Sequence, residues 1–406
     1  MTNFSGGSRR RRHCQGGLAI LALLFLACSP GDAAQGRGKH IVLNITNPAP
    51  IARKEVIAVP LAEILRRLPT SDPKNVHAET LPRHNGLPTQ LFSSVPGGPL
   101  DTLLILVSLA PLQRIQLRFF LDEAASTPKP LVYGRAVPER KDDFAWENDK
   151  VAYRVYGPAL QGTGEISSGI DVWSKRVSDL IINDWYAKDA EGQRTKNPAL
   201  TYHRDTGEGL DSYDVGPTRG CGGTAILSGG RFFVSRNYAQ AEILANGPIR
   251  LQFRLRYAAW QAGDLAVSEE KIITLDAGAH MNKIQSTFSF EGAPSVEAGI
   301  GLAAHPHAET NASAEDGIAS VWEPLTDPSA GMVGTGIVLP AGAAATTREA
   351  DGNLYFVLNA KPDLPIVYYA GAGWSKSDIS DQVAWRKYLK DFSVDLQRPL
   401  QLSWAD

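Results

Sequence analysis

Short runs of strand-like residues, separated by turn residues, make up most of the chain. Between His40 and Tyr133 they include "HIVLNITN", "KEVIAVP", "DTLLILVSL" and "QRIQLRFFL", with Pro, Gly, Asn or Asp between them. Strands at this spacing predict a small antiparallel β-sandwich of about 100 residues. "LAEILRRL" is a short helical interruption, and "ASTPKP" at Ala125–Pro130 is typical of a linker. We therefore expect a first domain over residues 39–130.

From Phe144 onward the predicted strands are longer, among them "RFFVSRNYAQAEILANG", "IRLQFRLRYAAW", "NKIQSTFSFEG" and "PLQLSW". Two helices are expected, at Val172–Ala187 and Asp378–Phe392. A long antiparallel run needs two large stacked sheets or a closed barrel to avoid exposed strand edges. The chain has no repeat of about 20 to 50 residues, which argues against a propeller or solenoid. The chain is therefore predicted to be all-β, with a second, larger domain over residues 131–406.

The first 34 residues have the pattern of an export signal. Arg9–Arg12 form a basic region, Leu18–Ala27 form a short apolar region, and small residues follow. The expected location is the periplasm or the outer membrane. "FLAC" at Phe25–Cys28 resembles a lipobox, in which Cys28 would be acylated and attach the protein to the membrane, whereas simple secretion is the alternative.

Composition narrows the function classes further. The chain has 406 residues, 43% apolar and 21% charged residues, and a formal net charge of -2. Such a chain has no field strong enough to gather nucleic acid. Cys221 is the one cysteine outside the leader, so the folded part has no internal disulfide. We interpret Cys221 as a small packed residue rather than a nucleophile.

Several long blocks, in order along the chain, resemble a bacterial family known as domain of unknown function 4861. They are "WENDKVAYRVYGPAL", "SGIDVWSKRV", "DWY", "YHRDTGEGLDSYDVGPTRGCGGTAIL", "SRNYAQAEILANGPIR" and "AWRKYLKDF". The resemblance implies an exported protein, often encoded among genes that degrade uronic-acid polysaccharides such as pectins and ulvan. It also implies that the larger domain is a β-supersandwich, as in galactose mutarotases and several polysaccharide-lyase domains. The expected partner is therefore an oligosaccharide.

β-Elimination of a uronate needs a cation at the carboxylate, a base for the C5 proton and an acid for the group that leaves C4. The stretch "YHRDTGEGLDSYDVGPTRGCGGTAIL" contains residues of these types, and its glycines permit tight turns. Arg236 and Tyr238 stand two apart in a predicted strand and would share one face. A surface connection and a solvated strand face are the alternatives. The catalytic candidates are His203, Glu208, Arg236 and Tyr238, and the substrate-binding candidates are Arg204, Asp211, Tyr213, Arg219, His305 and Trp374.

Two further features bear on cofactors and sugar binding. His305 and His307 stand around Pro306 near Glu309, but the sequence identifies no fourth ligand, so no metal and no other cofactor is expected. Trp374, in a glycine-rich run, is the candidate for an exposed platform on which a sugar ring stacks.

These observations predict an exported carbohydrate-active enzyme, a lyase or dehydratase that forms an unsaturated uronate. One alternative is a glycoside hydrolase or mutarotase that uses the carboxylates around Glu208 with His203. Another alternative is a carbohydrate-binding lipoprotein without catalysis.

Overall fold

The N-terminal part of the computed structural model is a small β-sandwich. The structure describes residues 39–124 and 128–405, so the predicted leader, with Cys28, lies outside the described residues. One sheet has the strand order β26-β1-β7-β3-β4, and the facing sheet has the order β2-β6-β5. Their bounds are β1 (Ile41–Thr46), β2 (Arg53–Pro60), β3 (Val76–Leu81), β4 (Asn85–Leu87), β5 (Thr89–Phe92), β6 (Thr102–Leu109), β7 (Arg114–Leu121) and β26 (Gln401–Trp404). Leu43, Ile105 and Phe119 are fully buried between the sheets, together with one face of α1 (Leu61–Arg67).

The last strand of the chain belongs to this small sandwich. β26 pairs antiparallel with β1 along Leu43↔Trp404 to Thr46↔Gln401. The sequence "PLQLSW" was correctly predicted as a strand, but its place beside β1 could not be predicted from sequence order. The chain therefore closes the sandwich with its own C-terminus, after helix α3 (Gln382–Gln397).

The larger part contains an eight-stranded sheet with the order β15-β16-β17-β18-β25-β22-β21-β20. Its strands are β15 (Gln240–Asn246), β16 (Arg250–Ala262), β17 (Leu265–Asp276), β18 (Met281–Ser289), β20 (Glu309–Ser313), β21 (Ile318–Pro324), β22 (Met332–Val338) and β25 (Pro365–Trp374). Alternation decides its two faces: Leu251, Phe253 and Leu255 of β16 are buried, whereas Gln252 points the other way, as period two requires.

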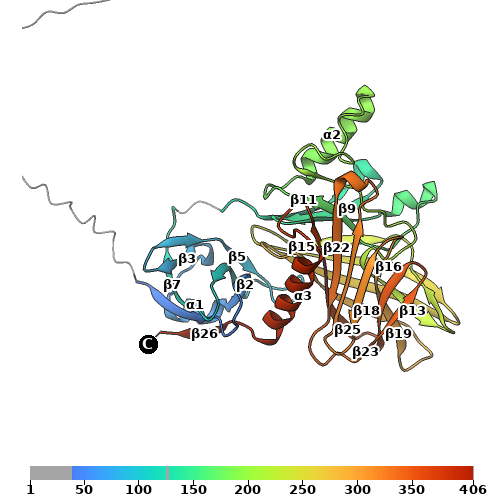
Figure 1. The fold of residues 1–406 in the computed structure, drawn as a ribbon. Helices are drawn as coiled ribbons and strands as arrows, with labels where there is room; N and C mark the ends of the chain where they lie inside the picture. Colours follow the sequence, from blue (N-terminus) through green and yellow to red (C-terminus); the bar gives the residue numbers. More distant parts are fainter. Residues whose placement is uncertain (1–38, 125–127, 406) are drawn as a thin grey trace, which may run out of the picture. The chain divides into compact units, whose positions relative to one another are not determined.

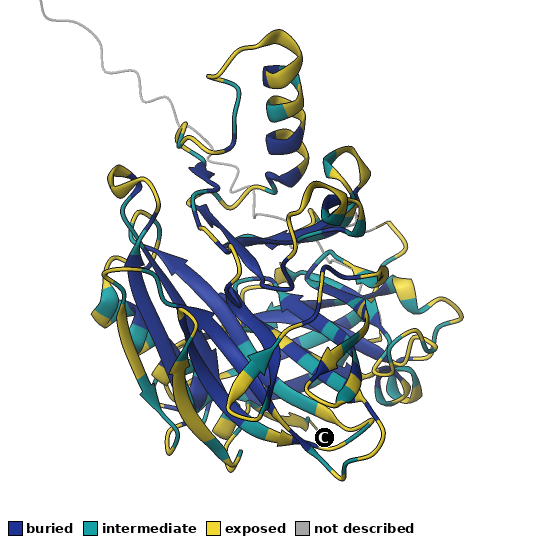
Figure 2. Ribbon diagram, turned by 90° about the vertical axis from the view of Figure 1, so that its right-hand side faces the viewer, coloured by how far each residue is buried: buried dark blue, intermediate teal, exposed yellow. Residues whose placement is uncertain are grey.

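Two five-stranded sheets cover the buried face of this sheet. Their orders are β14-β13-β19-β24-β23 and β12-β11-β10-β9-β8. The strands are β8 (Val132–Val137), β9 (Asp143–Asn148), β10 (Ala152–Val155), β11 (Asp171–Lys175), β12 (Gly209–Leu210), β13 (Cys221–Ser228), β14 (Arg231–Phe233), β19 (Val296–Ala303), β23 (Ala345–Ala350) and β24 (Asn353–Ala360). Trp146, Phe253 and Phe356 share one core, and Figure 2 shows the buried layers facing each other. Every pair of these strands is antiparallel, so the all-β prediction is confirmed, as a supersandwich of stacked sheets.

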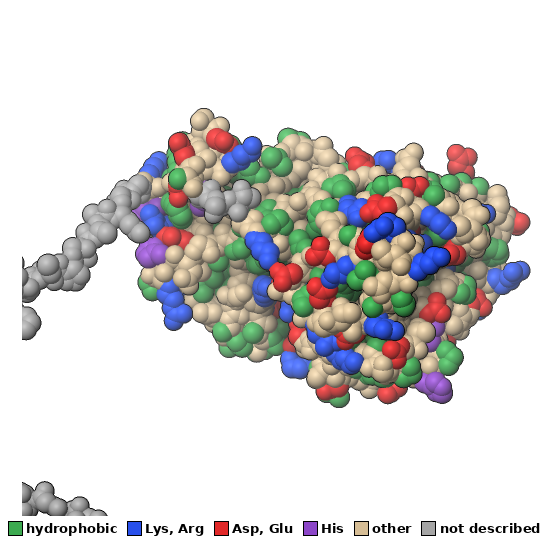
Figure 3. All heavy atoms as spheres, turned by 90° about the horizontal axis from the view of Figure 1, so that it is seen from above, with side chains coloured by type: hydrophobic (Ala, Val, Ile, Leu, Met, Phe, Trp, Pro, Cys, Tyr) green, Lys and Arg blue, Asp and Glu red, His purple; other side chains and the backbone are tan. Residues whose placement is uncertain are grey.

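Few helices interrupt the strands (Figure 1). Helix α2 spans Ile182–Thr195, and the short 3-10 turns within residues 39–124 and 128–405 are η1 (Pro73–Asn75), η2 (Pro138–Arg140), η3 (Pro158–Thr163) and η4 (Pro328–Ala330). No helix among the described residues is long and apolar enough to cross a membrane. On the face drawn in Figure 3, cationic and anionic side chains are interspersed, without a large patch of one sign.

Three of the predicted elements were wrong in their bounds, and one of them, the predicted helix at Asp378–Phe392, is α3 (Gln382–Gln397). The predicted helix at Val172–Ala187 is strand β11 followed by α2, because Val172 and Trp173 pair with β10. The predicted single strand "RFFVSRNYAQAEILANG" is two strands, and Arg236 and Tyr238 lie in the connection between β14 and β15. Their shared strand face therefore does not exist.

Candidate active site

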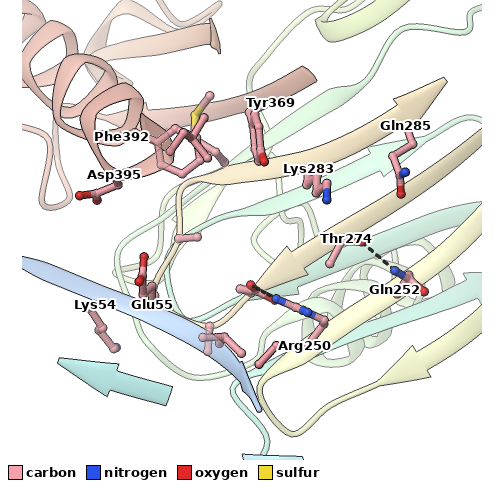
Figure 4. A pocket seen from close by; sticks show the side chains of 18 of the residues that line it. Lys54, Glu55, Arg250, Gln252, Thr274, Lys283, Gln285, Tyr369, Phe392 and Asp395 are labelled. Atoms are coloured by element: carbon pink, nitrogen blue, oxygen red, sulfur yellow. Dashed lines mark hydrogen bonds and ion pairs between the residues drawn. The ribbon is translucent and has the colours of Figure 1, made fainter. Parts of the chain in front are cut away.

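A large cleft lies on the outer face of the eight-stranded sheet. Its volume is about 930 Å³, and its walls come from β2 and the Ser93–Asp101 connection of the small sandwich and from α3. A cleft of this size matches that of small-molecule and oligosaccharide sites, which range over about 300–1,000 Å³. Figure 4 shows polar side chains of β16, β17, β18 and β25 pointing into it.

The sheet register places four of these side chains in one row. Gln252 is opposite Thr274, Thr274 is opposite Lys283, and Lys283 is opposite Tyr369. Directly opposed residues share one face with their Cβ atoms about 5 Å apart. Gln252 also donates a hydrogen bond to Thr274 over 3.1 Å. An amide, a hydroxyl, an amine and a phenol therefore line the floor of the cleft side by side.

Lys283 stands near the middle of the row and is open to the cleft. Among the described residues, no carboxylate pairs with it, because the nearby Asp276 is held by Arg250. Burial lowers the pKa of Lys283, and the positive charge of Arg250 lowers it further. Both effects favour the neutral amine, the form that accepts a proton.

Tyr369 faces Lys283 across the two strands. Its ring packs edge-to-face on Phe392 of α3, with the ring centroids 5.2 Å apart. Burial raises the pKa of Tyr369, and the charge of Asp276 adds to the rise. The phenol therefore keeps its proton and is suited to donate it.

Arg250 is fixed at the edge of the row. Its guanidinium donates two hydrogen bonds of 2.6 Å to Asp276 and lies over the Phe92 ring at 5.2 Å. Gln90 of the small sandwich accepts hydrogen bonds from the backbone of Ile249 and Arg250 and donates one to the Arg250 carbonyl. A residue of β5 thus anchors the first residue of β16, so the small sandwich holds this side of the cleft in place.

Two carboxylates lie at the end of the cleft beside α3. Arg53 donates a hydrogen bond of 2.8 Å to Glu55, and its Nε is 3.1 Å from Asp395. Burial raises the pKa of Asp395 to about 7. The positive charge of Arg53 opposes this rise, whereas the negative charges of Glu55 and Asp391 add to it. Burial also raises the pKa of Glu55.

None of the ten residues proposed from the sequence lines this cleft. His203 is exposed, and its Nδ1 lies 3.1 Å from the Asp211 carbonyl oxygen. Asp211 is buried. Arg154 donates a hydrogen bond of 3.0 Å to Asp211 and one of 2.6 Å to Asp171. Burial and the charge of Asp211 raise the pKa of Asp171 to about 7. Asp211 is thus part of a buried charge cluster that joins strands, and Arg204 is exposed nearby.

Tyr213 and His305 contact each other. The Tyr213 ring is buried and lies edge-on to His305 at 5.9 Å. Both oxygens of the buried Glu323 accept from His305, from its backbone N–H at 2.9 Å and its ring Nδ1 at 3.0 Å. The hydrogen bond to Glu323 raises the pKa of His305. Within the described residues, no three His, Cys, Asp or Glu side chains gather as a metal site.

Arg236 and Tyr238 bond to separate partners. Arg236 is exposed and donates a hydrogen bond of 2.6 Å to Gln161. The buried Tyr238 donates its hydroxyl proton to the Asp142 carbonyl. Neither residue contacts His203 through a hydrogen bond or ion pair in the described structure.

The remaining candidates have structural partners. Glu208 accepts hydrogen bonds from Trp185 and Lys188, which lower its pKa. Arg219 is 1% exposed and bonds Ser168 over 2.8 Å. Trp374 is not an exposed platform, because it is 2% exposed and its indole N–H donates to the Ala330 carbonyl over 2.8 Å.

Cys221 is buried, as its interpretation as a packed residue requires. Burial raises the pKa of its thiol to about 12.

The cleft residues carried one weak signal in the sequence. Polar residues alternate with buried ones in "RLQFRLR" and "MNKIQSTFS", which gives Gln252, Lys283 and Gln285 a common outer face. Such a face is usually solvated, and the covering elements come from distant parts of the chain. Sequence reasoning therefore missed Lys283 and Tyr369.

Comparisons with known proteins add the following. The model of a family described as a domain of unknown function, DUF4861, matches residues 45–402. "Uncharacterized protein P7" of Formosa agariphila is 33% identical over 401 residues, covering 94% of this chain and 96% of that protein.

Two solved structures from Enterococcus faecalis are also similar to this chain. A protein in the glycosyl hydrolase family 38 has a TM-score of 0.49 and 10% identity, covering 91% of this chain and 48% of that chain. An alpha-mannosidase has a TM-score of 0.48 and 9% identity, with 91% and 46% coverage. The chain spans about half the length of these two proteins, and TM-scores this low do not bear on its activity.

Proposed function

The chain belongs to the DUF4861 family, and we propose that it is a carbohydrate-active enzyme that cleaves uronic-acid-containing oligosaccharides by β-elimination in the cleft on its eight-stranded sheet. The observation that supports this most is the cross-strand pair of Lys283 and Tyr369. Its amine has a lowered pKa and its phenol a raised one. A base and an acid with pKa values moved in these directions, on one face of a cleft, are suited to one elimination.

The proposed reaction assigns one role to each group. Arg250, Gln252 and Gln285 donate hydrogen bonds to the uronate carboxylate, which stabilises the negative charge that develops beside C5. The amine of Lys283 takes the C5 proton, and the electron pair of that C–H bond becomes the C4–C5 double bond. The C4–O bond breaks, and the leaving oxygen takes the hydroxyl proton of Tyr369. The products are an unsaturated uronate and a free sugar hydroxyl.

The test is to incubate the purified protein with a panel of acidic oligosaccharides and record ultraviolet absorbance. We expect absorbance from the conjugated C4–C5 double bond to grow with the same time course as new chain ends. New reducing ends without that absorbance would contradict elimination.

Hydrolysis is the second candidate function, and the pair Glu55 and Asp395 favours it. A carboxyl group that keeps its proton near neutral pH beside a second carboxylate is the arrangement of a glycosidase. In that case the Glu55→Gln variant would lose turnover, whereas Lys283→Arg would retain it. The products formed by the wild-type protein and by Lys283→Arg would then be saturated.

Export is also part of the proposal, and its support is the pattern of the leader described above. An enzyme outside the cytoplasm would meet the products of extracellular polysaccharide degradation. Cell fractionation with an antibody to the folded part would test it, and recovery in the cytoplasm alone would contradict it.

A further inference from the structure

A smaller pocket opens beside the cleft. Its volume is about 190 Å³, and it lies between the Ser93–Asp101 connection and strand β15. Phe92 and Gln252 line both the pocket and the cleft. The two hollows are therefore neighbours. Gln252, at one end of the row that continues through Thr274 and Lys283 to Tyr369, lies at their boundary.

The two hollows differ in charge. Lys54, Glu55 and Lys283 are among several charged residues of the cleft. The side pocket has no charged residue in its lining, which is made of amide, hydroxyl, glycine and apolar groups such as Ser93 and Leu100. A ligand unit in the side pocket would therefore meet no cation and no carboxylate.

The walls of the side pocket are held in a fixed shape. Gly97 has a φ of +75° and Gly247 a φ of +80°, values that favour glycine at both turns. A Cβ on Gly98 would lie 3.0 Å from the Ser93 hydroxyl, so the connection is tightly folded. The amide of Asn246 exchanges hydrogen bonds of 3.1 and 2.9 Å with the backbone of Gly134. The pocket is thus a formed part of the structure.

We propose that the side pocket binds an uncharged sugar unit next to the uronate held in the cleft. A carboxylate placed there would lose water without gaining a cation, which costs free energy. A neutral sugar can offer hydroxyl groups to the amide and hydroxyl groups and its apolar ring face to Phe92 and Leu100. The substrate is then an oligosaccharide of acidic and neutral units, not a uniform polyuronate. This inference rests on the proposed function of the cleft.

The test uses Leu100, which is 56% exposed in the connection and so tolerates replacement. Binding is measured by calorimetry for two oligosaccharides of equal length, one of uronates only and one of alternating acidic and neutral units. The wild-type protein should bind the alternating oligosaccharide more tightly. Leu100→Lys adds a cation and should raise the relative affinity for the uniform polyuronate by about three- to fivefold, the size of one partly exposed ion pair. Leu100→Gln, of similar size but neutral, should keep the wild-type preference.

The outcomes separate this inference from the function on which it rests. Equal wild-type affinity for the two oligosaccharides, with no change in Leu100→Lys, would overturn the side-pocket assignment while the cleft proposal stands. Failure of the wild-type protein to bind any acidic oligosaccharide would overturn the cleft proposal itself.

Discussion

The surroundings of Lys283 lower its pKa, which suits this lysine to act as a base. Its neighbours are the phenol of Tyr369 and the paired Arg250, and the amine remains free of carboxylates within the described structure. The positive charge of the Arg250 guanidinium disfavours a second positive charge nearby, so it lowers the pKa of the Lys283 amine. Tyr369, opposite it, is held with its proton by burial. The two residues differ from ordinary surface Lys and Tyr because both line the cleft, where partial desolvation shifts their pKa values.

Replacement of Lys283 by Arg should separate binding from catalysis. Arginine keeps the positive charge but stays protonated at every working pH, so it cannot take the C5 proton. We expect turnover to fall by about 10²–10⁴-fold with a small change in KM. Lys283→Met should weaken binding as well. Lys361→Arg, on an exposed turn, is the control that should match the wild type.

Steady-state kinetics on the same acidic oligosaccharide checks this prediction. A Lys283→Arg enzyme with wild-type kcat would exclude the residue as the base. Circular dichroism of each variant confirms that the sheet is retained.

The pH profile should rise on its acidic side through the pKa of Lys283. The base works only when deprotonated, so kcat/KM increases as the pH rises through that pKa, which burial and Arg250 hold below its usual 10.5. Tyr369→Phe should lower the whole profile without moving this limb. A limb that persists unchanged in Lys283→Arg would assign the titration to another group.

At the scale of elements, the strands were easier to predict than the helix that stands among them. β16 and β18 alternate buried and outward residues clearly, so their faces follow from period two. Helix α2 starts ten residues later than predicted, because its cap is not local. Its first backbone N–H groups, at Ile181 and Ile182, donate to Glu147 of β9 over 2.7 and 2.9 Å. Glu147 lies 34 and 35 residues before these two backbone groups, so a prediction from neighbouring residues could not identify this cap.

Glu147→Gln should therefore destabilise the protein strongly. Glu147 also accepts a hydrogen bond of 2.6 Å from Lys175, and both side chains are fully buried. Removal of one partner leaves a buried charge without compensation, which costs about 3–5 kcal/mol. Urea denaturation followed by circular dichroism measures the loss. Glu191→Gln, on the exposed side of α2, should change stability by less than about 0.5 kcal/mol.

A double variant tests the cause of that loss. Glu147→Gln combined with Lys175→Met removes both charges, so it should recover part of the stability lost in Glu147→Gln alone. Equal losses in the single and double variants would assign the effect to the α2 cap rather than to the ion pair.

At the scale of the whole molecule, the cleft is assembled from segments that lie far apart in the sequence. Glu55 comes from the small sandwich, Lys283 from the middle of the chain and Asp395 from α3. Sequence alternation could mark Lys283 as outward but could not show that the small sandwich and α3 form walls of a cleft around that face. Conversely, the charge-rich stretch from Tyr202 to Leu227 was predicted to be a site. In the structure Asp211 and Arg219 are buried, and their hydrogen bonds hold strands and connections together.

Arg53 of the small sandwich binds the end of α3, and this contact should make stability depend on pH. Arg53 donates to the carbonyl oxygens of Asp395 and Arg398 at the end of α3. Burial raises the pKa of the Asp395 carboxyl, in the last turn of that helix, to about 7 in the folded protein against 3.8 as its ordinary value. Between about pH 4 and pH 7 the folded protein then holds more protons than the unfolded chain, so stability falls as the pH rises through this window.

Asp395→Asn should remove this dependence, since an amide does not titrate. The melting temperature of the variant, relative to the wild type, should therefore rise between about pH 4 and about pH 7, and the difference should level off above that range. Differential scanning fluorimetry at constant ionic strength measures both curves. Asp184→Asn, which removes an exposed carboxylate of α2, should follow the wild-type curve. Parallel curves for Asp395→Asn and the wild type would show that Asp395 is already ionised in this window and pairs with Arg53 as a carboxylate.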